Sequence, residues 1–254
     1  MNGRTLLLLA IPAVALVVPP GALSAGEPAL SGYQYLTPET RQLQDDEFAN
    51  PGMLWVEQGR KNWNEGDKSC ATCHGASSSL KGAAARYPKF DPTLGRVINL
   101  EQRINDCRTR HQGAPALAYE SPALLALTAL VAYQSRGVPT DVAVDGPAAA
   151  SFANGKQFFY QRRGQLDIAC SQCHEQRAGQ HLRGETISQG QTNGYPLYRQ
   201  LWQTLASSHR MFAWCNEAVR AEPYPPGSQD YVDLELFLRW RGTGLTVESP
   251  AVRR

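Results

Sequence analysis

Two short stretches, Cys70-Ala71-Thr72-Cys73-His74 and Cys170-Ser171-Gln172-Cys173-His174, carry the same Cys-x-x-Cys-His motif and decide how this chain is organised. Each motif follows a segment that begins with glycine, at residues 59–63 and 155–159, and each precedes one further cysteine. A helical segment ending in Arg-Gly closes each half. Because the same parts recur in the same order, the sequence predicts a tandem duplication of a small helical domain.

Apolar spacing and capping residues indicate where the helices lie. The pattern turns helical at Met53, a second helix spans 100–109, and a third follows the helix start Ser121-Pro122. Proline and glycine at 85–100 indicate a loop. The predicted fold is mainly α, with an N-terminal arm at 26–52, a first domain at 53–138, a linker at 139–150 and a second domain at 151–254.

Residues 1–25 have the pattern of a secretory signal peptide, with Arg4, an apolar run at 6–18 and a small-residue exit. The apolar run is too short and too proline-broken to span a bilayer comfortably. An uncleaved membrane anchor is the alternative. We therefore expect an exported mature chain that begins near Gly26 and has no membrane span. The formal charge of +2, from 25 basic and 23 acidic residues, does not indicate a nucleic-acid-binding protein.

The paired motifs are typical of covalent haem attachment. The two thiols of each motif are placed to take up the haem vinyl groups as thioethers, and the histidine that follows can reach the iron. The predicted attachment and iron-ligating residues are Cys70, Cys73 and His74 in the first half, and Cys170, Cys173 and His174 in the second. A zinc site and a thioredoxin-like redox pair are the alternatives. Two c-type haems would make each half a cytochrome c-like domain.

Each haem iron needs one more axial ligand, and each half has one remaining cysteine, Cys107 or Cys215. A thiolate is a soft ligand that suits haem iron. Matching places in the repeat favour both cysteines as distal ligands. A disulfide between them is the alternative in an oxidising compartment. Other possible ligands are His111, His181, His209 and Met211.

Cys215 differs from Cys107 in its neighbours. Arg210 and Arg220 flank it, and Trp214 precedes it. Two guanidinium groups beside a thiol could hold a divalent sulfur oxyanion such as thiosulfate through charge-assisted hydrogen bonds. Pairing of the arginines with haem propionates or nearby glutamates is the alternative.

Four stretches together resemble the SoxA family, the dihaem cytochrome subunits of the SoxAX complexes of thiosulfate oxidation. They are residues 46–53, residues 59–74, residues 194–199 with Trp202, and residues 215–224. The resemblance covers essentially the whole mature chain, and the segment around Cys215 is its most diagnostic part.

The resemblance implies a periplasmic L-cysteine S-thiosulfotransferase. It would couple thiosulfate oxidatively to a cysteine of the carrier protein SoxYZ and pass electrons through haem to the partner cytochrome SoxX. It also implies that Cys215 is the catalytic cysteine, able to carry an extra sulfur as a persulfide, and that Cys107 is the distal ligand of the first haem. The family often has a run of arginines before the catalytic cysteine, whereas here Met211, Ala213 and Trp214 leave only Arg210. Arg220 is therefore the first choice for binding substrate.

Two other functions use the same residues. A plain dihaem electron carrier would need Cys215 only as a ligand. A thiosulfate dehydrogenase would join two thiosulfates to tetrathionate and would need no protein substrate. A dihaem peroxidase fits less well, because an iron ligated by cysteine offers peroxide no open position. Either thiosulfate or the carrier cysteine could bind first.

Overall fold

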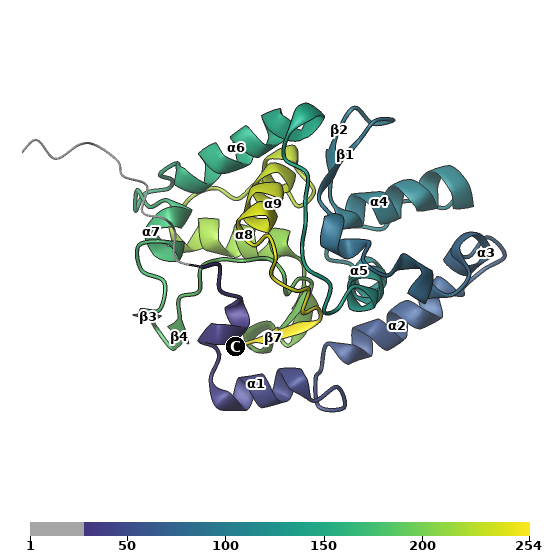
Figure 1. Cartoon of the computed structure of the whole chain (residues 1–254), viewed down its shortest axis with the longest axis horizontal. Coiled ribbons are helices and arrows are strands. Elements are labelled where there is room, and N and C mark those ends of the chain that lie inside the picture. Colours follow the sequence, from purple (N-terminus) through teal and green to yellow (C-terminus); the bar gives the residue numbers. More distant parts are fainter. Residues whose placement is uncertain (1–27) are drawn as a thin grey trace, which may run out of the picture.

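Two pairs of packed helices carry the fold of this protein, for which the computed structural model describes residues 28–254. Helix α2 (Met53–Trp63) packs against α5 (Pro122–Gln134), and α6 (Ala149–Tyr160) packs against α9 (Gln229–Arg241). The first pair lies on the right of Figure 1 and the second on the left. The expected mainly α fold is confirmed. The expected signal peptide at 1–25 lies outside the described residues.

Each helix pair is closest at a glycine. A Cβ atom added to Gly59 would overlap the carbonyl oxygen of Ala126, and one added to Gly155 would overlap that of Asp233. In both cases the added atom would also lie close to the Cβ atom of the residue one turn further along, at 2.8 Å from that of Leu130 and 3.0 Å from that of Phe237. These are the glycines that open the two repeated segments, so the sequence repeat coincides with two equivalent close approaches between helices.

Short helices carry the two motifs. Helix α3 (Cys70–His74) follows α2, and α7 (Cys170–His174) follows α6. The Ser69 side chain caps α3 by accepting from Thr72 N at 3.2 Å. The Gln172 side chain closes the start of α7 by accepting from Ala169 N at 2.8 Å. Each motif is therefore held by local hydrogen bonds at the end of a packed helix.

In the remainder of the first half, the structure differs from the expected loop at residues 85–100. Residues 85–100 are not all loop, because they contain the antiparallel hairpin β1 (Lys89–Asp91) and β2 (Arg96–Ile98). The Asp91 carboxylate accepts from the backbone of the turn, which lets Pro92 and Gly95 reverse the chain. Helix α4 (Leu100–Cys107) then begins with an Asn99 capping box. It ends in a π-helical turn, η4 (Arg108–Gln112), and Ser121 caps α5 as predicted.

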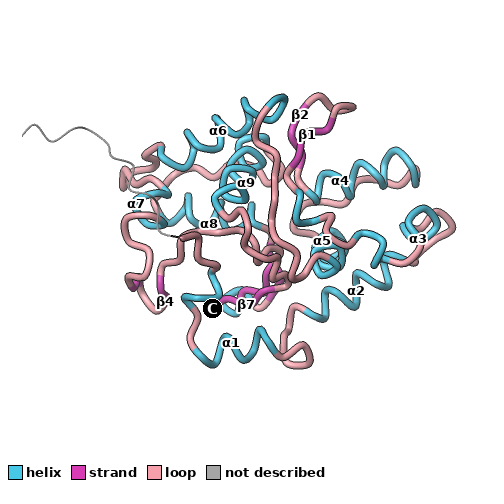
Figure 2. The backbone as a smooth tube through the Cα atoms, viewed as in Figure 1, coloured by secondary structure: helices cyan, strands magenta, loops and turns pink. Residues whose placement is uncertain are grey.

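The second half adds short strands and one further long helix. Its elements are η5 (Gly146–Ala148), β3 (His181–Leu182), β4 (Glu185–Thr186), β5 (Leu197–Arg199), η6 (Gln200–Trp202), β6 (Thr204–Ala206) and α8 (Ser208–Ala218). The remaining 3-10 turns of the first half are η2 (Ser77–Leu80) and η3 (Ala84–Arg86). Figure 2 shows how much loop joins these elements.

The N-terminal arm packs against the end of the chain. It forms η1 (Gly32–Tyr35) and α1 (Pro38–Asp45), and the C-terminus forms β7 (Ala251–Arg253). Strand β7 pairs in parallel with β5, which pairs antiparallel with β6, so the sheet order is β6-β5-β7. The buried Gln44 side chain accepts from Val252 N at 3.0 Å and so ties α1 to this sheet.

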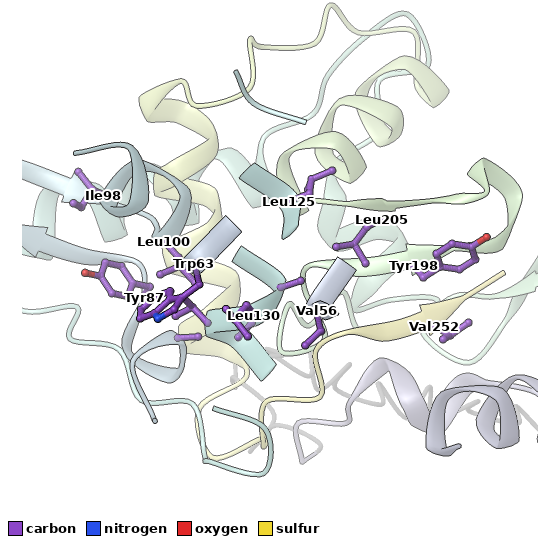
Figure 3. Close-up of a cluster of buried hydrophobic side chains, with 14 residues drawn as sticks. Val56, Trp63, Tyr87, Ile98, Leu100, Leu125, Leu130, Tyr198, Leu205 and Val252 are labelled. Carbon is purple, nitrogen blue, oxygen red and sulfur yellow. The ribbon is translucent and has the colours of Figure 1, made fainter. Parts of the chain in front are cut away.

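The two halves share their buried core. Figure 3 shows Val56, Trp63 and Leu130 of the first half in one cluster with Leu205 and Val252 of the second. A smaller cluster joins Val97 and Val142 to Leu236 on α9. No helix among residues 28–254 is long and apolar enough to cross a membrane.

A buried polar cluster also lies at this junction. The Glu235 carboxylate accepts from Asn99 Nδ2 at 3.1 Å and lies 3.1 Å from His209 Nε2. Burial raises the pKa of Glu101 to about 8, and the charges of Glu235 and Glu120 add to the rise. Arg239 opposes that rise, although burial lowers its own pKa.

We expect Gly155→Ala to lower the free energy of unfolding by about 2 kcal/mol or more, because its methyl group would overlap the α9 backbone. Helix propensity alone would give the opposite sign, a gain of about 0.5–1 kcal/mol. Thermal unfolding followed by circular dichroism measures the change. The control is Gln157→Ala on the exposed face of α6. A Gly155→Ala protein as stable as this control would show that the helices are not in tight contact.

The Glu101 carboxyl should make stability depend on pH. The unfolded carboxyl releases its proton near 4.5, whereas the folded one holds it up to about 8, so the free energy of unfolding should fall as pH rises through this interval. Glu101→Gln should flatten that fall in urea denaturation curves recorded across the range. Glu57→Gln, at an exposed site on α2, is the control. Parallel pH profiles for the wild type and Glu101→Gln would contradict this assignment.

Candidate active site

Helix α8 carries Cys215 beside the second motif. His209, Phe212 and Asn216 form the buried face of α8, and Cys215 lies half-buried on another face, one turn after Met211. Burial raises the pKa of the Cys215 thiol to about 12, and the Cys170 and Cys173 sulfurs are close enough to raise it further. The structure therefore brings Cys215 close to both thiols of the second motif.

Contacts of the His174 side chain set the tautomer and the orientation of its imidazole ring. Its Nδ1 lies 2.8 Å from the Ser188 carbonyl oxygen, so Nδ1 carries the proton and Nε2 is left with a free lone pair. Burial lowers the pKa of His174, against the effect of this hydrogen bond, and so favours the neutral ring. Gly190, at φ +74°, packs against the imidazole, where a Cβ atom would lie 3.0 Å from the ring. These contacts hold the ring as an iron-ligating histidine requires.

The first motif has the same set of thiols. Burial raises the pKa of Cys107, and Cys70 and Cys73 add to the rise while Arg103 opposes it. Gln112 Nε2 donates to the Cys70 sulfur at 3.6 Å. Cys107, at the end of α4, is therefore close to the first Cys-x-x-Cys pair.

A cavity of about 360 Å³ lies next to this group, within the range of sites that hold small molecules and cofactors. Its lining combines apolar side chains with polar ones, two cations and one carboxylate, and includes Glu65, Lys68, Arg108, Gln112, Leu117, Ala123 and Leu127. Apolar walls suit a porphyrin face and the cations suit its propionates, so the residues present fit a haem. His74 itself is exposed, and its ring lies 5.7 Å from that of Trp63.

The other possible ligands occupy different places. All six cysteines are free thiols, so Cys107 and Cys215 are not joined. His209 is fully buried, its Nδ1 accepts from Gly227 N at 2.9 Å and its Nε2 faces Glu235, so neither nitrogen is available. Within residues 28–254 no three His, Cys, Asp or Glu side chains converge as a cage for a bare metal ion.

The two predicted substrate arginines lie at opposite ends of α8. Arg210 stacks on Trp202, with its guanidinium carbon 4.5 Å from the ring centroid. Arg220 is exposed and has a left-handed backbone, φ +58°. It ends α8 in a Schellman motif, in which Ala221 N donates to Asn216 O at 2.9 Å.

Arg199 is a third arginine at this site, and it is not among the residues predicted from the sequence. Its charge opposes the rise in the pKa of Cys215. Its guanidinium carbon lies 5.5 Å from the Trp202 ring centroid and 5.3 Å from that of Trp214. The available signal was that Arg199 is the single charged residue of the largely apolar and aromatic stretch 195–202.

Comparisons with known proteins agree with this arrangement. Residues 58–140 match the family model described as SoxA/TsdA, cytochrome c domain. L-cysteine S-thiosulfotransferase subunit SoxA of Rhodovulum sulfidophilum is 42% identical over 88% of this chain and 79% of its own length. The SoxA subunit of Pseudaminobacter salicylatoxidans is 42% identical over 89% of this chain and 81% of its own.

A solved structure extends this likeness to the fold. The crystal structure of SoxXA from P. pantotrophus matches with a TM-score of 0.86 and 37% identity, covering 89% of this chain and 87% of that one. Identity at this level over nearly the whole described chain shows common descent, and the chain belongs to the SoxA family.

Proposed function

We propose that this protein is an L-cysteine S-thiosulfotransferase subunit that couples thiosulfate to a cysteine of the carrier protein SoxYZ, with Cys215 as the catalytic residue. The placement of Cys215 carries the proposal. Its sulfur lies beside the second motif and within the electrostatic reach of a buried arginine. The SoxA relatives that share most of this sequence bear the name of this activity.

Two covalent c-type haems complete the proposed enzyme. Cys70 and Cys73 would attach the first haem, which His74 and Cys107 would ligate. Cys170 and Cys173 would attach the second, with His174 and Cys215 as its iron ligands. The bound haem would supply a one-electron acceptor next to the reacting sulfur. The free Nε2 of His174 and the cavity near Cys107 support these assignments.

The chain is, in this proposal, a tandem duplication of two cytochrome c-like domains at 53–138 and 151–254, joined by the linker 139–150. The matching close approaches at Gly59 and Gly155 support a common plan for the two halves. The arm at 26–52 would pack outside both domains, as its contact with β7 indicates.

The proposed reaction balances as an oxidation. Thiosulfate and the carrier thiol lose one proton and two electrons as the terminal sulfur of thiosulfate bonds to the carrier cysteine. Arg210, Arg220 or both would guide the dianion toward Cys215. Cys215, or its persulfide, would hold the sulfur until the carrier thiolate displaces it. Half-burial would limit access of water to that sulfur.

The proposed partner is a SoxX cytochrome, because the solved relative is a SoxXA complex. It would receive the electrons. A periplasmic location would follow from the predicted signal peptide and from covalent haem attachment. The matched family model names TsdA beside SoxA, so thiosulfate dehydrogenase, which forms tetrathionate, is the second candidate.

Cys215→Ser should abolish thiosulfate conjugation, because a hydroxyl neither ligates iron like a thiolate nor forms a sulfur–sulfur bond. Mass spectrometry of the carrier cysteine measures the product, and a Cys215 peptide map shows whether thiosulfate adds reductant-sensitive sulfur. The matched control is Cys107→Ser, which alters the other distal cysteine and should retain conjugation. Thiosulfate conjugation by the Cys215→Ser variant would contradict the proposal. Tetrathionate formation without a carrier would favour the second candidate.

The Cys70→Ser/Cys73→Ser double variant should lose one of two haems. Without thioether bonds the first haem is held only by its ligands and its cavity. Intact mass and pyridine haemochrome absorbance should give two haems for the wild type and one for the variant. A wild-type protein with a single covalent haem, or an unchanged count in the variant, would contradict the two-haem assignment.

A further inference from the structure

The His174 ring lies where two segments of the second half meet. One is α7 itself, which His174 ends and Glu175 follows. The other is the loop after β4, in which the Ser188 carbonyl oxygen accepts from His174 Nδ1 at 2.8 Å and Gly190 packs against the imidazole. The orientation of the ring therefore depends on how these two segments are held relative to each other.

Arg241, the last residue of α9, contacts both segments. Its Nη1 donates to the Gln189 carbonyl oxygen at 2.9 Å, one residue after Ser188. Its Nη2 lies 3.2 Å from Glu175 Oε1, one residue after His174. A guanidinium presents its donors in a rigid planar fork, so this one side chain fixes the separation of the two segments.

Helix α6 in turn holds the guanidinium and its carboxylate partner in place. The Arg241 Cζ atom lies 4.5 Å from the centroid of the fully buried Phe159 ring. Tyr160 Oη donates to Glu175 Oε1 at 2.9 Å. The Arg241 side chain is only 14% exposed, so solvent weakens its interactions less than those of a surface arginine. These contacts leave the fork little freedom to move.

The first half has the equivalent arginine in a different arrangement. Each half closes in a helical segment that ends in Arg-Gly, and Arg136 takes the place of Arg241. Arg136 Nη1 is ion-paired to Glu47 of the N-terminal arm at 2.9 Å. The residue after His74 is Gly75, which offers no carboxylate, and His74 is exposed. The closing arginine is therefore ion-paired beside the motif histidine in the second half and to the arm in the first.

We propose that Arg241 is a positioning residue for His174. By joining Glu175 to Gln189, it keeps the Ser188 carbonyl oxygen against Nδ1 and so fixes the orientation in which Nε2 ligates the haem iron. A fixed hydrogen bond from Nδ1 also strengthens the imidazole as a ligand. This inference rests on the role of His174 as an iron ligand, which is part of the proposed function.

The test uses the haem-loaded chain in complex with SoxX and compares electron paramagnetic resonance (EPR) spectra of the oxidised complexes. The g values of a low-spin haem report the orientation and strength of its axial ligands. The Cys70→Ser/Cys73→Ser variant, which should keep only the second haem in this chain, identifies the signal of that haem. Haem content and unfolding temperature are recorded in parallel.

The matched control is Arg253→Gln in β7. The Arg253 side chain is 15% exposed, is ion-paired to Glu248 and donates to a backbone carbonyl, so it resembles Arg241 in burial and in its kinds of partner. Its partners Glu248, Gln44 and Val252 lie outside the two segments that hold the His174 ring. Loss of this arginine should therefore affect stability alone.

Arg241→Gln should shift or split the EPR signal of the second haem and leave the signals of the first haem and of the SoxX haem unchanged. Arg241→Lys should show the same change, because it keeps the charge but lacks the planar fork that spans both acceptors. Arg253→Gln should lower the unfolding temperature and leave every signal unchanged. Glu175→Ala, at a site 34% exposed where folding is little affected, should shift the same signal as Arg241→Gln.

Three results would overturn the inference. An unchanged spectrum in a less stable Arg241→Gln would make Arg241 purely structural, and Glu175→Ala decides the same point if Arg241→Gln does not fold. A spectrum restored by Arg241→Lys would assign the effect to charge alone. Equal changes in Arg241→Gln and Arg253→Gln would indicate a general effect of losing a buried arginine. Failure of the wild-type complex to conjugate thiosulfate would instead count against the proposed function.

Discussion

The close approach of α6 to α9 at Gly155 is the contact on which the candidate site depends. With no side chain at residue 155, the backbones of the two helices can touch. Helix α6 is followed by the second motif, and α9 presents Glu235 to His209 on α8. Because α8 carries Cys215, the crossing of α6 and α9 positions both the second motif and Cys215. The equivalent approach at Gly59 does the same for α2, α5 and the first motif.

The two centres share this plan but differ in what surrounds them. His174 is held by Ser188 and covered by Gly190, whereas His74 is exposed. A buried arginine between two indoles, Arg199, counters the rise in the pKa of Cys215, whereas Arg103 counters and Asp106 adds to the rise in the pKa of Cys107. A half-buried sulfur near a buried cation suits bond formation, and the exposed histidine of the first motif suits a centre that exchanges electrons. This contrast is the physical basis for placing the chemistry in the second half.

Buried charged side chains from the two halves of the chain also lie close together. Glu101 of α4 lies more than 130 positions before Glu235 and Arg239 of α9, yet the three side chains are buried together. Burial raises the pKa of Glu235, but the hydrogen bond and charge of His209 outweigh this and leave it lowered. The two carboxyls thus differ in protonation because only one has a basic partner in direct contact.

The sequence by itself determined the features that depend on neighbouring residues. The motifs, helix α2, the Ser121 cap of α5 and the cysteine after each motif could all be predicted, since caps, turns and apolar periods act over a few residues. The hairpin at 89–98 was missed because its turn residues are also those of a loop. Only the tertiary structure decided the β6-β5-β7 sheet, which pairs residue 197 with residue 251, and the place of Arg199 between the rings of Trp202 and Trp214. Such pairings depend on how distant segments pack, and no local pattern encodes which aromatic rings a buried arginine will contact.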